Sequence, residues 1–236
     1  MIDYQQTGKV ARLTLNSPAT GNRYTYRIML DFIAALERAA QSDATVLVLS
    51  ARGNDFTLGR DQKEQLPHVS RRESLSLILR ANEALAQFPG VSIALIHGRA
   101  LGFGTGLALH STISIAADDA ILGFDEIDHK LAPLVVVAYL PYFIAPRVAD
   151  ELVLTGRPVP ADEAQRIGLV TRVVPAHGLQ QAGEELIERL NGHSAGALKL
   201  IRKFSREGGG SRDYPRAERS QQAVEQLSQW LEAGRP

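Results

Sequence analysis

The stretch that decides the fold is Val91-Ser-Ile-Ala-Leu-Ile-His-Gly-Arg-Ala-Leu-Gly-Phe-Gly-Thr-Gly-Leu-Ala-Leu-His110. Its beginning, residues 91–96, is a continuous aliphatic run that predicts a strand covered on both faces. A glycine-rich turn follows, and residues 102–111 predict a short helix of small residues. Such a turn lets the backbone approach a ligand closely, and the start of the helix adds a partial positive charge there.

The elements around this stretch predict an α/β chain. Upstream, 45–51 is another buried strand, followed by a polar loop over 52–65 and an amphipathic helix over 71–88. Successive strands separated by helices are normally parallel and joined by right-handed crossovers. After residue 134 nearly everything reads as helical. Further elements are expected as strands at 2–5, 10–16, 113–117, 120–124 and 170–174, and as helices at 26–40, 195–206 and 214–232.

The composition is that of an ordinary globular chain. Of 236 residues, 44% are hydrophobic and 22% are charged, which allows a substantial core in one domain. Basic and acidic residues both number 26, so neither a nucleic acid nor an anionic membrane is expected as a partner. There are no cysteines, which excludes disulfides, thiolate nucleophiles and cysteine-based metal sites.

No segment predicts export or membrane insertion. The first residues have neither the basic region nor the apolar region of a signal peptide. The longest apolar stretch, 131–145, is interrupted by Pro133 and Pro141 and is too short to span a bilayer. We therefore expect a cytoplasmic protein.

A second segment with a recognisable pattern precedes the first one in the chain. It is Asn54-Asp-Phe-Thr-Leu-Gly-Arg-Asp-Gln-Lys-Glu64, directly after the strand at 45–51. The two segments resemble the two sequence blocks of the crotonase superfamily, Phe-Ser-Ala-Gly-Ala-Asp-Leu-Lys-Glu and Gly-x-Ala-x-Gly-Gly-Gly-x-Glu-Leu-Ala. The resemblance covers residues 8–174 in order. Further matching segments lie at 117–124, 125–126, 131–133, 149–156 and 161–170.

This resemblance implies a fold and an assembly. The fold class is α/β, with a crotonase spiral core of ββα units over residues 1–190. A helical C-terminal segment, 191–236, is expected to pack in a trimer, so the chain would be a homotrimer or a hexamer. The substrate would be an acyl-CoA thioester, with coenzyme A as part of the substrate, no separate cofactor and no metal.

The resemblance also implies an oxyanion hole, made by the backbone N–H groups of Arg60 and Phe103. Chemistry at the α-carbon of a thioester places negative charge on the carbonyl oxygen, and two converging N–H groups stabilise it. Taken alone, the glycines at 102, 104 and 106 also fit close helix–strand packing or a dinucleotide phosphate turn. A dinucleotide turn needs a third glycine at another offset and an acid after the next strand, and it leaves 56–64 unexplained.

The chain departs from the hydratases of the family at one of their two glutamates. The first position is Gly106, whereas the second is Glu126. Leu134 stands where hydratases tend to have glycine. Because a single base can take a proton from one carbon and return it to another, the loss favours double-bond isomerisation over hydration. Glu126 is therefore the expected catalytic base.

Several side chains are expected to contact coenzyme A or the acyl group. Basic candidates near the site or on the helix at 195–206 are Arg60, Lys63, Lys199, Arg202 and Lys203, although those on the helix also fit a solvated face. The acyl pocket is expected from 65–75 and 135–143. The predicted substrate-binding residues are Asn22, Arg23, Leu58, Gln62, Gly104 and Leu134.

Other readings stay open at this point. A crotonase-type decarboxylase or hydrolase of an acyl-CoA or β-dicarbonyl substrate would keep the oxyanion hole. A catalytically silent member would act through assembly or ligand sensing. Asp61 is expected to cap a turn and His110 to be a buried core residue, while Asp128 and His129 are expected in an exposed loop.

Overall fold

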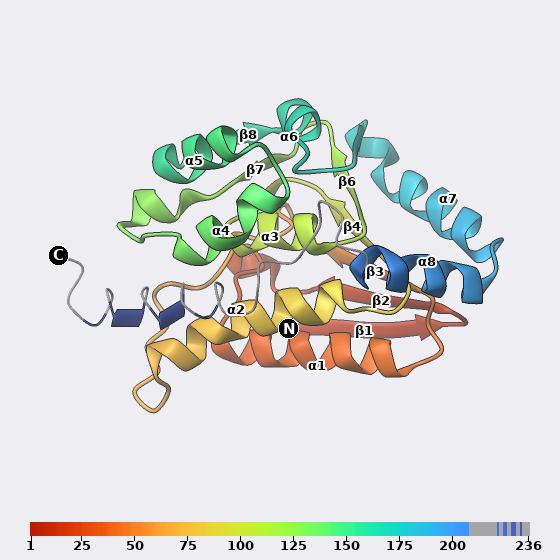
Figure 1. Ribbon diagram of the computed structural model, residues 1–236, viewed down its shortest axis with the longest axis horizontal. Coiled ribbons are helices and arrows are strands. Elements are labelled where there is room, and N and C mark those ends of the chain that lie inside the picture. Colours follow the sequence, from red (N-terminus) through yellow and green to blue (C-terminus); the bar gives the residue numbers. More distant parts are fainter. Residues whose placement is uncertain (208–220, 222–223, 226–227, 230–231, 233–236) are drawn as a thin grey trace.

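A six-stranded sheet is the centre of the computed structural model, which describes residues 1–207, 221, 224–225, 228–229 and 232 (Figure 1). The strand order is β1-β2-β3-β4-β6-β9, with β1 and β2 antiparallel and the remaining pairs parallel. The strands are β1 (Ile2–Thr7), β2 (Val10–Leu15), β3 (Val46–Ala51), β4 (Val91–Ile96), β6 (Ile113–Ala117) and β9 (Arg172–Val174).

A second, three-stranded sheet has the order β5-β7-β8 and lies next to the first. Its strands are β5 (Arg99–Leu101), β7 (Ile121–Gly123) and β8 (Val159–Pro160). The chain therefore alternates between the sheets: β4 and β5 precede helix α3 (Phe103–His110), and β6 and β7 precede helix α4 (Leu134–Tyr139). This is the ββα spiral that the sequence predicts.

The long helices begin at side-chain caps that the sequence supplies. Thr25 accepts a hydrogen bond from the backbone N–H of Ile28 at the start of α1 (Tyr26–Gln41). Ser70 accepts one from Glu73 at the start of α2 (Arg71–Ala86). Such caps satisfy backbone donors that have no partner in the first helical turn. Helices α1 and α2 pack against each other, and α2 also packs on α3 (Figure 1).

The later part of the chain is mainly helical, as expected. Helix α7 covers β3, β4 and β6, and α8 reaches β4. Two strands were not predicted: β5 lies within the expected glycine-rich turn, and β8 lies in the part expected to be helical. The helix expected at 214–232 lies largely outside the described residues. The helices are α5 (Pro146–Thr155), α6 (Ala161–Ile167), α7 (Leu179–Asn191) and α8 (Ala195–Glu207), and the 3-10 turns are η1 (Pro18–Thr20), η2 (Asp125–His129), η3 (Leu140–Tyr142) and η4 (Ala176–Gly178).

The core lies between the sheet and these helices. Strand β4 is buried along its whole length, and most of β3 is buried as well. Such continuous burial explains why both strands read as aliphatic runs without alternation. Within the part of the chain that the structure describes, no helix is both long and apolar enough to cross a membrane.

Candidate active site

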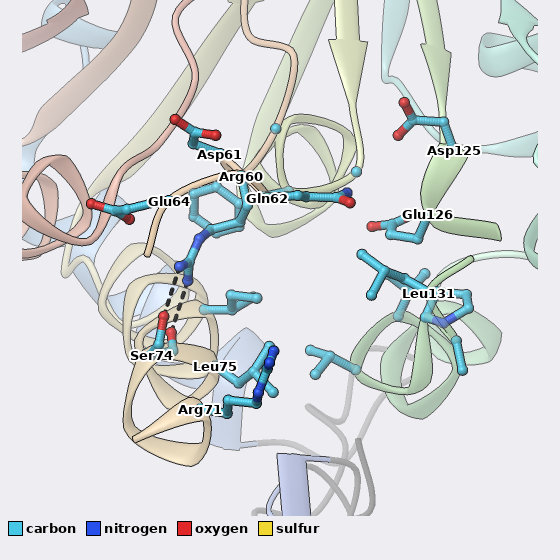
Figure 2. Close-up of a pocket in the computed structure, with 18 of the residues that line it drawn as sticks. Arg60, Asp61, Gln62, Glu64, Arg71, Ser74, Leu75, Asp125, Glu126 and Leu131 are labelled. Atoms are coloured by element: carbon cyan, nitrogen blue, oxygen red, sulfur yellow. Dashed lines mark hydrogen bonds between the residues drawn. The ribbon is translucent and has the colours of Figure 1, made fainter. Parts of the chain in front are cut away.

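A pocket of about 510 Å³ lies where the spiral brings five segments together. The loop over 58–67 and the first half of α2 form one side, while the start of α3, turn η2 and helix α4 form the other. Figure 2 shows Gln62 and Glu126 pointing toward one another across this space, from opposite sides. The pocket combines a polar inner rim with an apolar wall that includes Leu75, Ile78, Leu131, Val135 and Val136.

Both predicted N–H donors lie at the rim of this pocket. Thr57 forms a parallel bridge with Ala100, and its carbonyl accepts a hydrogen bond of 3.0 Å from Leu101. Arg60 and Phe103 each lie three residues beyond this bridge, so the two segments arrive side by side. A methyl group on Gly59 would come within 3.7 Å of the Phe103 nitrogen. Among the described residues, neither backbone N–H has a hydrogen-bond acceptor.

The Arg60 N–H faces the pocket because its neighbours use the other side of the backbone. The carbonyl of Gly59 accepts from Tyr24, and the N–H of Asp61 donates to the carbonyl of Tyr24, both at 2.9 Å. In an extended segment, successive N–H groups point to opposite sides. The intervening N–H of Arg60 therefore points away from Tyr24, toward the start of α3.

The Phe103 N–H is exposed to the pocket because it begins a helix. The first N–H groups of a helix have no partner within it. Gly102 reaches this position at φ +52°, which a side chain would disfavour. The Phe103 ring points into the core and packs edge-on against Tyr24 at 4.9 Å. Because the Phe103 ring is buried in the core, its backbone N–H is directed toward the pocket.

The Glu126 carboxylate lies directly beside this amide. A methyl group on Gly102 would come within 2.8 Å of Glu126 Oε1. The residue as a whole is partly exposed, but Oε2 is buried and has no hydrogen-bond partner among the described residues. Burial, with a smaller contribution from the charge of Asp125, raises the pKa of Glu126 to about 7. This carboxyl can therefore both take up and release a proton near neutral pH.

The far end of the pocket differs from the end at Glu126. Gly106, one turn along α3, faces Tyr139: a methyl group there would lie 3.0 Å from the hydroxyl oxygen. The same methyl group would lie 4.0 Å from Oδ1 of Asn82 on α2. Tyr139 lines the pocket, and its ring packs edge-on against His110 at 4.9 Å. The space of the family's first glutamate is thus bordered by a hydroxyl and an amide.

His110 is buried, as predicted, and belongs to the frame of the site. Its Nδ1 lies 2.7 Å from the carbonyl of Gly106, so Nδ1 is the donor. Burial lowers the pKa of His110 to about 4, and the ring is neutral at physiological pH. Because it is neutral, it adds no positive charge beside the pocket.

The predicted substrate-binding residues divide into two groups. Leu58 and Gln62 line the pocket, together with Glu126, Arg60 and Phe103. Asn22 does not: it is 3% exposed, and its amide bonds to Ser17, Arg52 and Asp55. We therefore correct its role to that of holding the loop. Three further residues fall outside the pocket lining, namely Arg23, Gly104 and Leu134.

These three residues act next to the pocket. The Arg23 guanidinium donates to the carbonyl of Leu58 at 2.8 Å and so supports the rim. A methyl group on Gly104 would meet Thr57 Cγ2 at 2.5 Å, which explains the glycine by close packing. Leu134 begins α4, and the next residues, Val135 and Val136, provide the wall instead.

The basic candidates are spread over several elements. The Arg60 guanidinium turns away from the rim and donates to the carbonyl and hydroxyl of Ser74 on α2, at 2.7 and 2.8 Å (Figure 2). It therefore ties the loop to the helix. Lys63, Lys199, Arg202 and Lys203 do not line the pocket. Arg202 on α8 donates to the carbonyl of Gly90 at 3.3 Å.

Sequence reasoning missed Asn82, which lies beside the pocket, and it included Tyr139 only within the range 135–143 that was expected to form the acyl pocket. A signal for Asn82 was present, because it stands four residues after Ile78 and three before Leu85, inside the apolar stripe of α2. A polar residue in such a stripe needs a reason. The sequence around Tyr139 contained no such signal, because a tyrosine at the end of an apolar helix is a common core residue. Other predictions were confirmed: Asp61 Oδ1 accepts from the N–H of Lys63 in a turn.

The ββα spiral and its pocket define an α/β protein of the crotonase class. Residues 5–230 match the family model described as enoyl-CoA hydratase/isomerase, and the chain belongs to this family of acyl-CoA enzymes. It is similar to a probable enoyl-CoA hydratase of Mycobacterium tuberculosis, which is 32% identical over 207 residues, or 83% of this chain and 73% of the relative.

Two further proteins extend this similarity. A putative enoyl-CoA hydratase of Thermus thermophilus is 29% identical over 206 residues, or 84% of this chain and 81% of the relative. The crystal structure of a probable enoyl-CoA hydratase from Mycobacterium thermoresistibile has a TM-score of 0.85 and 26% identity, and covers 99% of this chain and 97% of that chain.

Proposed function

We propose that this family member isomerises the double bond of a 3-enoyl-CoA thioester to the 2-enoyl form, with Glu126 as its one carboxylate acid/base. The observation that carries the proposal is the asymmetry of α3: a buried carboxylate with a pKa of about 7 lies at Gly102, whereas the wall at Gly106 has no carboxylate. Isomerisation needs one such group, whereas hydration favours two.

The proposed reaction begins with the thioester oxygen between the N–H groups of Arg60 and Phe103. The Glu126 carboxylate takes a proton from C2, and the negative charge moves onto the thioester oxygen. Each hydrogen-bond donor to such an oxygen typically contributes a factor of about 10²–10³ in rate. Return of a proton to C4 gives the 2-enoyl product, and the carboxyl of Glu126 is able to supply it.

The apolar wall supports isomerisation over addition of water. Leu131, Val135 and Val136 contact the pocket on the side of α4, and Leu75 and Ile78 contact it from α2. An acyl chain fills such a space and leaves little room for solvent near its double bond. A dienolate then meets a proton donor of the protein before it meets water.

The experiment is incubation with 3-enoyl, 2-enoyl and malonyl-type thioesters, followed by mass spectrometry. Conversion of 3-enoyl to 2-enoyl without a change of mass, lost in Glu126→Gln, is the expected result. A gain of water would replace the proposal by a hydratase, loss of CO2 by a decarboxylase, and release of CoA by a hydrolase. Binding without turnover in any case would identify a silent member.

We also propose that the chain assembles as a homotrimer or hexamer through its C-terminal segment. Helix α8 exposes Leu200 and Ile201, with 66% and 61% of their surface accessible. Large apolar side chains exposed together are typical of an interface. Light scattering after size exclusion should give three or six times 25.7 kDa, and Leu200→Glu with Ile201→Glu should shift it to monomer. A monomeric wild-type chain would refute this.

A further inference from the structure

The wall of the pocket at Gly106 contains a polar group that the proposed reaction has not used. Tyr139 is 3% exposed, lines the pocket, and has its hydroxyl oxygen where the side chain of residue 106 would begin. A phenol in an otherwise apolar acyl pocket has a proton to donate. Its position on α4, one turn beyond Val135, directs it toward α3 at the end away from Glu126.

Asn82 approaches the same position: a methyl group on Gly106 would lie 4.0 Å from its Oδ1. It is completely buried on α2, and neither atom of its amide has a hydrogen-bond partner among the described residues. Leaving a buried polar group unpaired is costly. The amide is therefore expected to gain a partner during the reaction. Because residue 106 is glycine, no side chain fills the space between Asn82 and Tyr139.

The spacing of the two ends suits a three-carbon unit. Gly102 caps the start of α3 and Gly106 lies within it four residues later, which is about 6 Å along a helix axis. Glu126 Oε1 lies against the first and the Tyr139 hydroxyl against the second. With the thioester oxygen at Phe103, C2 lies beside Glu126 and the chain continues toward Tyr139. Reacting groups that each approach their carbon to about 3 Å can thus serve C2 and C4.

We propose that Tyr139 is the proton donor to C4 and that Asn82 is its positioning residue; this rests on the proposed isomerisation. The Glu126 carboxylate takes the proton from C2 and becomes neutral, leaving a dienolate. The Tyr139 hydroxyl gives its proton to C4 and becomes a phenolate, while the dienolate becomes the 2-enoyl thioester. After product release, the proton on Glu126 passes to the phenolate through solvent, and both groups are restored.

The Asn82 amide explains how a buried phenolate forms. Its NH2 group has no acceptor among the described residues, so it can donate to negative charge that appears only during the reaction. An interaction made only at that stage raises the rate without tightening substrate binding. Neutral His110, packed against the Tyr139 ring, keeps the ring in place and contributes no charge.

The test follows deuterium from C2 of a dideuterated 3-enoyl-CoA through the product. If Glu126 alone moves the proton, part of the label taken from C2 reappears at C4. With two groups, C4 receives hydrogen from solvent. We expect no transfer in the wild-type chain, and in Tyr139→Phe a fall in kcat of about 10²-fold with an unchanged KM and measurable transfer, because only Glu126 remains as donor.

Two further variants test the assignment. Asn82→Leu should lower kcat of the wild-type chain but not of Tyr139→Phe, since it acts through the hydroxyl. Tyr142→Phe removes a hydroxyl from the adjoining turn, outside this pocket, and should leave kcat and label unchanged. If Tyr139→Phe keeps its rate and its label pattern, the assignment is wrong and the isomerase stands. If the wild-type chain isomerises no thioester, both proposals fall.

Discussion

At Gly102 and at Gly106, a missing side chain on helix α3 leaves space that an oxygen from another element occupies. At the first position the oxygen is Glu126 Oε1 from turn η2, and at the second it is the Tyr139 hydroxyl from α4. The first oxygen belongs to a carboxyl that ionises near neutral pH, whereas the second belongs to a phenol. The same backbone opening therefore serves two kinds of chemistry.

The proposed isomerisation would change the reaction of the family scaffold without changing its fold. The N–H donors depend on strand pairing and on the start of a helix, so they are insensitive to side-chain identity at 60 and 103. The proposed acid/base groups, in contrast, are single side chains on separate elements. Replacing one of them leaves the two backbone N–H groups and the pocket in place. The following predictions test how unequal the two ends are.

The largest effect is expected from Glu126→Gln. The substitution keeps the shape of the side chain and removes the base, so kcat should fall by about 10²–10⁴-fold. KM should change little, because the backbone donors and the apolar wall remain. Steady-state kinetics with the thioester that the wild-type chain converts will measure this. Asp128→Asn, an exposed neighbour in the same turn, is the control, and an equal loss there would contradict the role of Glu126.

Much of this comparison was readable in the sequence. The aliphatic runs of β3 and β4 and the glycine-rich turn are local features, and each predicts its element from its own neighbours. The role of Glu126 came instead from the resemblance to the crotonase superfamily, and it stays a prediction. Tyr139 was expected only as part of the range 135–143, and Asn82 was not predicted at all. Their positions next to Gly106 depend on how α2, α3 and α4 meet there. The Asn22 side chain was misassigned because its partners, Arg52 and Asp55, lie 30 and 33 residues away.

The next largest effects are expected from replacing each of the two glycines with alanine. In Gly102→Ala the residue would be held at φ +52° with its methyl group 2.8 Å from Glu126 Oε1. Backbone strain of this kind costs about 1–3 kcal/mol, and displacement of the carboxylate should lower kcat by about tenfold or more. Thermal unfolding and kinetics will report both losses.

Gly106→Ala is the matched variant within the same helix. Its backbone is helical, so alanine gains up to about 1 kcal/mol in helix propensity. The methyl group would lie 3.0 Å from the Tyr139 hydroxyl, which offsets part of this gain. We expect a melting temperature close to that of the wild-type chain and a smaller loss of kcat than in Gly102→Ala. A larger loss of kcat in Gly106→Ala than in Gly102→Ala would contradict the expected order of the two effects.

The pH dependence gives a smaller effect with a definite sign. The folded protein raises the pKa of Glu126 from 4.5 to about 7 because burial disfavours the charged form. Activity should rise with pH through this value, since the base must be ionised. Stability has the opposite trend: between these pH values the folded state binds the proton more tightly, so the free energy of unfolding falls as pH rises.

Denaturant unfolding of the wild-type chain and of Glu126→Gln at pH 5 and pH 8 will measure how much the ionisation of Glu126 contributes to the free energy of unfolding. The raised pKa corresponds to about 1–3 kcal/mol of stability lost by pH 8. Glutamine cannot ionise, so the variant should gain that amount relative to the wild-type chain at pH 8 and not at pH 5. A difference between the chains that is independent of pH would show that burial of Glu126 is relieved when it ionises.

The smallest effect concerns Asp125, the neighbour that raises the pKa of Glu126 by its charge. Asp125→Asn removes this repulsion and leaves burial in place, so the midpoint of the activity profile should move down by a fraction of a pH unit. The substitution also weakens the contact of Asp125 with His129, now at 3.2 Å, which lies outside the pocket lining. Repeating the activity profile at high salt separates the loss of charge repulsion from the loss of the contact with His129, because salt screens a charge that is partly exposed. A shift that shrinks with salt is electrostatic and leaves burial as the main cause, whereas a shift that persists would mean that Asp125 holds the carboxylate of Glu126 in place.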